Sequence, residues 1–183
     1  MALALTLPAV GTASAAPTTG SCAVDQADAK RTVHALMNHC SATQILDLFA
    51  QAPLGEAPRS TKTISLLPVF EIGGNQLPRS VAFPMTRAQG TLGDSLTFTT
   101  KAGQPWVYKN YFFGPDLGGP LVSSVSRIDR KPVHAADFTL DFYGVPLSLH
   151  EYRQLTPTVW IGRDIGGGDG PTDTPTGGAI ALH

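Results

Sequence analysis

Charged residues are scarce in this chain of 183 residues: they make up 15% of it, and the formal net charge is −1. So little positive charge provides no basic field for the phosphates of a nucleic acid and no polybasic patch for a membrane surface. Beyond the N-terminal segment, no apolar run is long enough to span a bilayer. The composition therefore predicts no nucleic-acid partner and no membrane span, and it leaves the oligomeric state open.

Motifs with a known chemistry are missing as well. The sequence contains no G-x-S-x-G serine, no H-E-x-x-H or H-x-x-x-H pair and no phosphate-binding loop. We therefore predict no cofactor and no metal centre. The missing motifs leave open whether the protein is an enzyme.

The N-terminus has features of an export signal. The first ten residues are apolar, the next six are small, and Ala13-Ser14-Ala15 has the small-x-small form of a signal-peptidase site. No Lys or Arg precedes Lys30, so the usual positive start of such a signal is absent. We predict a signal peptide over residues 1–15 and a secreted protein. The alternative is an alanine-rich disordered N-terminus.

Cysteine is rare, since Cys22 and Cys40 are the only two in the chain. In a secreted protein an even pair predicts a disulfide, here one that closes a small loop over a helix. The competing interpretation is a metal site that adds His34 and His39 to the pair, but the sequence has no C-x-x-C spacing to support it. We predict the disulfide Cys22–Cys40.

Glycine and proline, by contrast, are abundant, with 19 and 15 residues, which is typical of a turn-rich β protein. Only residues 16–58 have a helical pattern, with helices predicted over 25–39 and 44–50. The second helix follows the capping-box sequence Ser41-Ala42-Thr43-Gln44. Residues 166–183 are rich in Gly, Pro and Thr, and this composition predicts a flexible tail.

Residues 59–165 carry the β pattern: short runs in which apolar and polar residues alternate, separated by turn-forming residues. The runs are 63–67, 69–72, 80–83, 95–99, 106–113, 121–128, 133–143, 150–155 and 158–162. In the run 133–143, Phe138, Leu140 and Phe142 are predicted to share a buried face. About eight strands after a helical hairpin predict a mainly β (α+β) fold, an antiparallel β-barrel with the helices at its mouth or on its outside. A β-sandwich is the alternative.

Three short segments near the end of this region form a recognisable pattern. Residues 129–132 read DRKP where the pattern has DGRP, residues 137–138 read DF where it has DY, and residues 150–162 read HEYRQLTPTVWIG where it has DEIRxVxPGxYLG. In this pattern the chain resembles a group of small microbial proteins with a lipocalin-like, calycin-type β-barrel, and it departs from them at Arg130, His150 and Thr158. The resemblance implies the barrel architecture and no particular activity.

The candidates for catalysis are His134, Asp137 and His150. His134 and His150 fall on predicted strands, and a barrel could bring either one near Asp137, Asp141 or Glu151. A His–carboxylate pair can transfer protons when burial tunes its pKa values. The alternative is that these side chains are exposed, because alternation along a strand also places polar residues on its outer face.

Candidate ligand-binding residues lie on the same predicted strands. Glu151 and Arg153 are two residues apart and therefore share a face. Pointing inward, Arg153 could bind a ligand carboxylate, with Glu151 holding it in place; pointing outward, the two would form a solvated pair. The aromatic residues that either line a cavity or form plain core are Trp106, Tyr108, Phe112, Tyr143 and Trp160.

Three functions remain open on the sequence. The first is a secreted binder of a small apolar or amphipathic molecule, possible for a barrel of this size. The second is an isomerase, cyclase or hydrolase acting on an apolar substrate in the same cavity. The third is a structural or interaction module with a filled barrel. We predict the first, because the pattern supports a barrel and no catalytic constellation. A buried His–carboxylate cluster in the cavity would favour the second.

Overall fold

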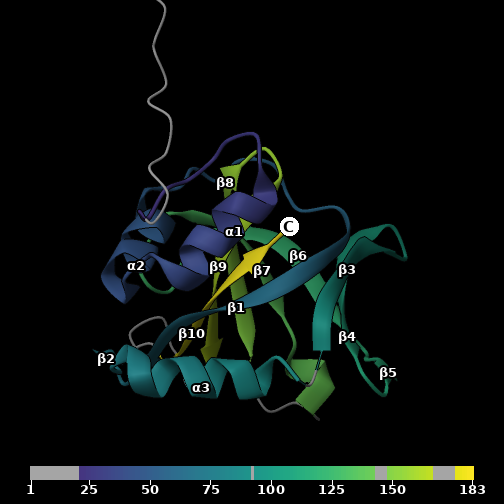
Figure 1. Ribbon diagram of the computed structural model, residues 1–183. Coiled ribbons are helices and arrows are strands. Elements are labelled where there is room, and N and C mark those ends of the chain that lie inside the picture. Colours follow the sequence, from purple (N-terminus) through teal and green to yellow (C-terminus); the bar gives the residue numbers. More distant parts are fainter. Residues whose placement is uncertain (1–20, 92, 143–147, 167–175) are drawn as a thin grey trace, which may run out of the picture.

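The computed structural model describes residues 21–91, 93–142, 148–166 and 176–183, and Figure 1 shows their course. The predicted signal peptide, residues 1–15, and Tyr143 lie outside the described residues. Strands predominate over helices in the described part of the chain, so the fold is mainly β, as predicted.

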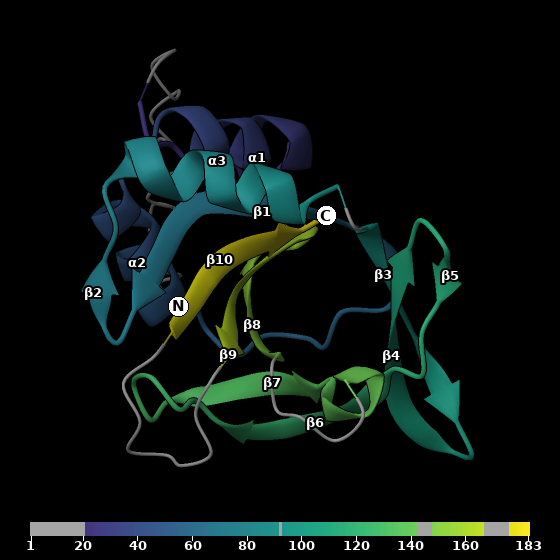
Figure 2. The same ribbon diagram turned by 90° about the horizontal axis from the view of Figure 1, so that it is seen from below.

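Eight of the described strands close into an antiparallel barrel (Figure 2). In order around the barrel they are β1 (Ser60–Ile72), β3 (Gly93–Lys101), β4 (Gln104–Tyr111), β6 (Gly119–Val125), β7 (Pro132–Asp137), β8 (Leu149–Thr156), β9 (Val159–Gly166) and β10 (Thr176–Leu182), which pairs back with β1. Two short strands pair with this ring, β2 (Asn75–Gln76) with β1 and β5 (Gly114–Pro115) with β4. The closed ring confirms the predicted barrel and excludes the sandwich.

Alternation along the strands divides their side chains between the barrel interior and its outside. On β8, His150 and Tyr152 point inward, whereas Glu151 and Arg153 point outward. On β9, Gly162 faces Tyr152 across the ladder, and a Cβ there would lie 2.9 Å from the Tyr152 ring. The glycine therefore makes room for the ring. The interior core consists of Leu96, Phe98, Val107, Leu121, Ala136, Phe138, Tyr152, Trp160, Ile180 and Leu182.

Helices α1 (Ala29–Asn38) and α2 (Ala42–Gln51) pack on the outside of the barrel (Figure 1). Their apolar faces form a second core with the outward side chains of the strands. Its largest aliphatic and aromatic members are Leu36, Ile45, Phe49, Leu67, Val69, Val133, Val159 and Ile161. The helices thus cover the outside of the barrel and leave its interior to the strands.

Local sequence signals determine where both helices begin. The Ser41 hydroxyl accepts a hydrogen bond from Gln44 N, and the Gln44 side chain accepts one from Ser41 N, which confirms the predicted capping box. Helix α1 begins at Ala29, later than predicted, because the Asp28 carboxylate caps it by accepting a hydrogen bond from Arg31 N. Cysteines 22 and 40 form the predicted disulfide, which links the segment before α1 to the segment after it.

The prediction of a strand at residues 80–83 is wrong, because a third helix, α3 (Arg79–Gln89), occupies this region and lies against β1 (Figure 2). Pro84 suggests an end to regular structure there, since proline lacks an N–H and crowds the preceding turn. The helix continues through it nevertheless. Ala82 and Thr86, one turn apart, are both buried on the side that packs against the barrel. Tertiary burial outweighs the local cost of the proline.

Proline also misled the prediction for β1. The sequence predicts two strands separated at Pro68, but β1 runs through it as one strand of 13 residues. The pairing register of β1 with β10 shifts between Leu66 and Phe70. Such an irregularity interrupts the ladder, so the N–H that Pro68 lacks is not needed there.

The flexible tail predicted over residues 166–183 is the largest difference between sequence and structure. Residues 176–182 form β10, which pairs with β9 on one side and with β1 on the other. Glycine is required at the close approach to β9, because a Cβ on Gly177 would lie 1.8 Å from the Asp164 carbonyl oxygen, and Gly177 has a φ of +146°. Gly177 is therefore there for a steric reason.

The run 133–143 is only partly a strand. It ends at Asp137 and continues as a 3-10 turn, η1 (Thr139–Phe142), whose first N–H donates to the Asp137 carboxylate. Phe138 is fully buried, as predicted, but Leu140 is 51% exposed, so the two do not share a buried face. The turn replaces the two-residue period of a strand, which is why the alternation fails here.

Candidate functional site

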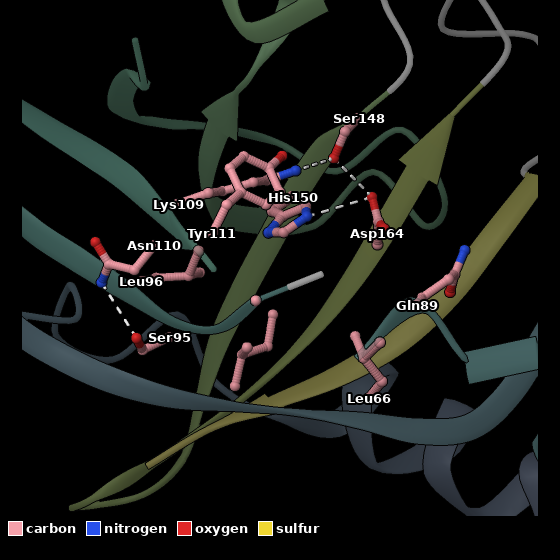
Figure 3. A pocket seen from close by; sticks show the side chains of 12 residues that line it. Leu66, Gln89, Ser95, Leu96, Lys109, Asn110, Tyr111, Ser148, His150 and Asp164 are labelled. Carbon is pink, nitrogen blue, oxygen red and sulfur yellow. Dashed lines mark hydrogen bonds and ion pairs between the residues drawn. The ribbon is translucent and has the colours of Figure 1, made fainter. Parts of the chain in front are cut away.

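A cavity of about 230 Å³ lies at one end of the barrel (Figure 3). One part of its wall is aliphatic and comes from Ile64 and Leu66 of β1 and Leu96 of β3. The rest is mainly polar and is formed by Gln89, Ser95, Lys109, Asn110, Tyr111, Ser148, His150 and Asp164. The cavity therefore has one apolar side and one polar side.

The polar side is a connected network (Figure 3). The Lys109 ammonium donates to the Ser148 hydroxyl over 2.8 Å, and that hydroxyl donates to Oδ1 of Asp164 over 3.0 Å. These side chains come from β4, from the residue before β8, and from β9. Each group donates to the next, from Lys109 through Ser148 to Asp164, so the network ends on the Asp164 carboxylate. The side chain of Asp164 is 32% exposed.

His150 joins this network from the barrel interior. Its Nδ1 lies 2.8 Å from the Tyr152 hydroxyl, and its Nε2 lies 3.3 Å from Oδ1 of Asp164. The second contact is close but poorly aligned, so among the described residues Nε2 has no hydrogen-bond partner. Since Asp164 is ionised, the hydrogen of the neutral ring belongs on Nε2, and Nδ1 accepts from Tyr152. The buried N–H thus lies beside the Asp164 carboxylate at the cavity wall.

Burial determines the charge of this histidine. It lowers the pKa of His150 below 6.5, and the attraction of Asp164 only partly opposes this effect. Burial raises the pKa of Asp164, but His150, Lys109 and the Ser148 hydrogen bond outweigh it, and that pKa is about 2. At neutral pH the site therefore contains a neutral imidazole beside a carboxylate.

A pair of carboxyl groups lies close to this network, in the segment between β4 and β6 and in η1. Asp116 Oδ1 accepts a hydrogen bond from the backbone N–H of Lys109, and Asp141 Oδ1 accepts one from Gly118. The second oxygen of each carboxyl is buried without a donor. Burial and the neighbouring Asp141 raise the pKa of Asp116 to about 7. A proton on Asp116 supplies the donor that the two oxygens lack.

The predicted anchor Arg153 lies outside the barrel, fully buried beneath α2. Its guanidinium bonds to both carboxylate oxygens of Asp129 and to the carbonyl oxygens of Phe49, Lys131 and Pro132. These contacts use all five N–H donors of the group, so it has none to offer a ligand. This position does not support the predicted role, because the shared face of the strand points away from the cavity.

Glu151 shares that outward face with Arg153, and it too has a structural position. Its carboxylate accepts hydrogen bonds from the Ser126 hydroxyl and the Arg127 backbone N–H. Burial raises its pKa, and these two hydrogen bonds oppose that effect. The carboxylate thus holds the turn between β6 and β7 in place and does not line the cavity.

The other weak candidates for catalysis do not join His150. His134 is buried towards the opposite end of the barrel, where its Nε2 lies 3.2 Å from the carbonyl oxygen of Gly55. Asp137 is exposed and accepts hydrogen bonds from Thr139. Of the three candidates, only His150 reaches the cavity.

The predicted aromatic residues line no part of this cavity as far as the structure describes them. Trp160 is inside the barrel at the end away from the cavity, and its Nε1 donates to the carbonyl oxygen of Glu56. Trp106 and Tyr108 lie on the outer side of β4, where the Lys101 ammonium sits over both rings. The aromatic residue that does line the cavity is Tyr111, whose pKa burial raises to about 12.

Sequence reasoning missed Lys109, Ser148 and Asp164, although Lys109 left a signal. Lys109 is two residues after the inward Val107, so alternation places a lysine inside the barrel, where an unpaired charge is costly. Asp164 pairs with His150 in the β8–β9 register. Counting the hairpin register outward from the turn at residues 157–158 would have paired His150 with Ile165, because an irregularity between Gln154 and Thr156 shifts the register by one residue.

Comparison with known proteins gave no match: no family model, no curated protein and no solved structure is similar to this chain. The resemblance of residues 129–162 to the lipocalin-like group therefore stays a prediction. No helix in the described ranges is long and apolar enough to cross a membrane. Fold and site define a closed eight-stranded barrel with a half-polar cavity at one end, and the functional argument rests on that cavity.

Proposed function

We propose that this is a secreted barrel protein that binds a small amphipathic molecule in the cavity between Leu66 and Asp164. The observation that carries the proposal is the division of the cavity wall, aliphatic on one side and polar on the other. A molecule with a short apolar body and one polar group matches both sides.

The volume limits the size of the ligand. At about 230 Å³, the cavity is smaller than the ~300–1,000 Å³ of ordinary ligand sites. With a share of roughly 30 Å³ per water molecule, it has room for roughly eight waters. The part of the ligand that the cavity encloses is thus smaller than a drug-sized compound: a short chain or a single ring.

The charges limit the polar group. Lys109 and Asp164 oppose each other across Ser148, so the positive and negative charges of the network are balanced. His150 adds a neutral ring to the cavity wall beside Asp164. An uncharged acceptor such as a carbonyl or hydroxyl oxygen fits this set better than a carboxylate, which would lie beside Asp164.

Export is supported by the disulfide between Cys22 and Cys40, because such bonds persist in oxidising compartments. Intact-mass measurement on protein secreted by its own host tests the export proposal. The expected mature chain starts near Ala16 and has no free thiol. A chain that retains Met1 would refute the predicted signal.

Binding is tested by native mass spectrometry of protein from its source, followed by titration with the molecule that co-purifies. Leu66→Trp fills the cavity from its aliphatic side and is expected to abolish binding. Leu140→Trp is the matched control, because Leu140 is exposed and does not line the cavity. Equal binding by both variants would show that the ligand lies elsewhere.

A second candidate function, a small barrel enzyme, is favoured by the buried His150–Asp164 pair. A neutral imidazole beside a carboxylate is a common arrangement for proton transfer, and here it borders a cavity. If the protein is an enzyme, the co-purifying molecule should turn over, and His150→Gln should stop the conversion while leaving binding measurable. If the wild type binds the molecule but forms no product, the enzyme function is excluded and the binding function remains.

A further inference from the structure

We propose that the amine of Lys109 forms a reversible imine with small aldehydes or ketones held in the cavity. The inference rests on the proposed binding function, for which it names a ligand class. It adds a covalent step that binding alone does not require.

The position of Lys109 sets it apart from the other lysines. It lies on the inward side of β4 and lines the cavity, with its Nζ 4.2 Å from the centre of the Phe138 ring and 2.8 Å from the Ser148 hydroxyl. The other four lysines of the chain are at positions 30, 62, 101 and 131, and none of them lines this cavity. A carbonyl compound in the cavity would meet one amine.

The surroundings favour the neutral, nucleophilic form of that amine. Burial lowers the pKa of Lys109, and the attractions of Asp164, Asp141 and Asp116 oppose this without cancelling it. A larger fraction of Lys109 is therefore the free amine at neutral pH than for a surface lysine, whose pKa is about 10.4. Desolvated lysines next to apolar groups are the ones that form imines.

The neighbouring groups can move the protons that the reaction requires. The amine lone pair forms a bond to the carbonyl carbon, the carbon–oxygen π electrons go to oxygen, and a proton passes from nitrogen to that oxygen. The resulting hydroxyl takes up a second proton, the carbon–oxygen bond breaks with loss of water, and the nitrogen lone pair forms the double bond to carbon. The nitrogen then gives up its remaining proton, so that amine and carbonyl yield one neutral imine and one water. No oxidant or reductant is consumed.

Each of these transfers has a partner on the polar side of the cavity. Ser148 bridges Lys109 Nζ and Asp164 Oδ1, so its hydroxyl can pass on the proton that nitrogen gives up. The neutral His150 ring also lines the cavity, with its Nε2 3.3 Å from Oδ1 of Asp164, so it helps to hold the carboxylate that receives this proton. The apolar body of the compound would lie against Leu66 and Leu96.

Reductive trapping tests the proposal. The folded protein is incubated at pH 7 with benzaldehyde and cyanoborohydride, which converts an imine into a stable benzyl amine, and the modified lysines are mapped by mass spectrometry. We expect Lys109 to be labelled faster than exposed Lys30, because burial lowers the pKa of the Lys109 amine. Lys109→Met should lose this fast site, and the control Lys101→Met should keep it.

The map of the wild-type protein is decisive by itself, so the inference can be tested even if Lys109→Met folds poorly. Labelling of Lys109 no faster than Lys30 would overturn it. Benzyl alcohol, which cannot form an imine, separates the two proposals when its binding is followed by saturation-transfer NMR. If it binds to the wild type but not to Leu66→Trp, and Lys109 is not preferentially labelled, the imine inference fails and the binding function stands. If nothing binds and nothing is labelled, both fail.

Discussion

Replacing Arg153 by methionine should destabilise the protein strongly, although the residue is far from the cavity. Its guanidinium holds together α2, through Phe49, and the turn between β6 and β7, through Asp129, Lys131 and Pro132. Methionine keeps the apolar stem but removes every donor, together with the guanidinium that lies 4.4 Å from the centre of the Phe49 ring. The carboxylate of Asp129, which is 19% exposed, loses its partner, and so do the three carbonyl oxygens.

The expected cost follows from the burial of this pair. Removing one partner of a buried ion pair typically costs about 3–5 kcal/mol, because the other charge stays behind uncompensated. The whole free energy of unfolding of a domain is about 5–15 kcal/mol. In urea, with a slope of about 2 kcal/mol per molar, the loss corresponds to a midpoint lower by about 1.5–2.5 M.

Urea unfolding followed by tryptophan fluorescence measures this difference. Arg87→Met is the matched control, since Arg87 is exposed at the end of α3 and should change the free energy by no more than about 0.5 kcal/mol. Adding Asp129→Asn to Arg153→Met removes the stranded charge. The loss of unfolding free energy in the double variant should therefore be smaller than the sum of the losses in the two single variants.

The pH dependence provides a second check on this pair. Burial raises the pKa of Asp129, but its hydrogen bonds with Arg153 outweigh this, and the pKa is lowered from 3.8. A lowered carboxyl pKa stabilises the fold above the unfolded value, and this contribution is lost as the pH falls below about 4. Arg153→Met should lose less stability on acidification than the wild type. A loss under about 1 kcal/mol in Arg153→Met at pH 7 would refute the assigned role.

Three further predictions concern the core, the disulfide and the carboxyl pair. Phe138→Ala should lower the free energy of unfolding by about 3–5 kcal/mol, whereas Leu140→Ala, at an exposed site, should change it by less than about 0.5 kcal/mol in the same urea assay. Reducing the disulfide should cost about 3 kcal/mol by the chain-entropy model, measured as the difference in unfolding with and without reductant. Because the pKa of Asp116 is raised to about 7, its contribution is fully present below its unfolded value of about 4 and is lost as the pH rises through 7. Asp116→Asn supplies a permanent donor to Asp141, so it should be more stable than the wild type at pH 8; the opposite order would contradict the shared proton.

Features determined by local sequence were the predictable ones. The capping box at Ser41 and Gln44 needs only residues that are close in the chain, and the structure has it. The strands with a clear two-residue period were found as well. The errors occurred where distant contacts override a local preference, as in the burial that holds α3 together through Pro84. Glycine at position 177 looked flexible because the carbonyl of Asp164 that requires it is visible only in the paired strands.

The same distinction applies to the candidate site. Once the strand is known, alternation places His150 and Arg153 on opposite faces of it. Which side faces inward depends on packing that the sequence of one strand does not contain. The contact between Lys109 and Ser148 joins residues 39 apart, and that from Ser148 to Asp164 joins residues 16 apart in the hairpin of β8 and β9. The first of these contacts depends on how β4 and β8 are placed in the barrel, which no local pattern contains.

Closure by β10 also has a consequence for the order of events during synthesis. Strand β1 leaves the ribosome well before β10, yet the two are neighbours in the finished barrel. Until β10 arrives, β1 and β9 present unpaired edges, which are templates for pairing with other chains. Contacts between residues so distant in sequence, such as Ile64 with Leu182, form slowly because the loop between them must close first. Until β10 pairs with β1 and β9, the newly made chain therefore has an open sheet that can pair with other chains, and the pairing of β10 removes this risk of aggregation.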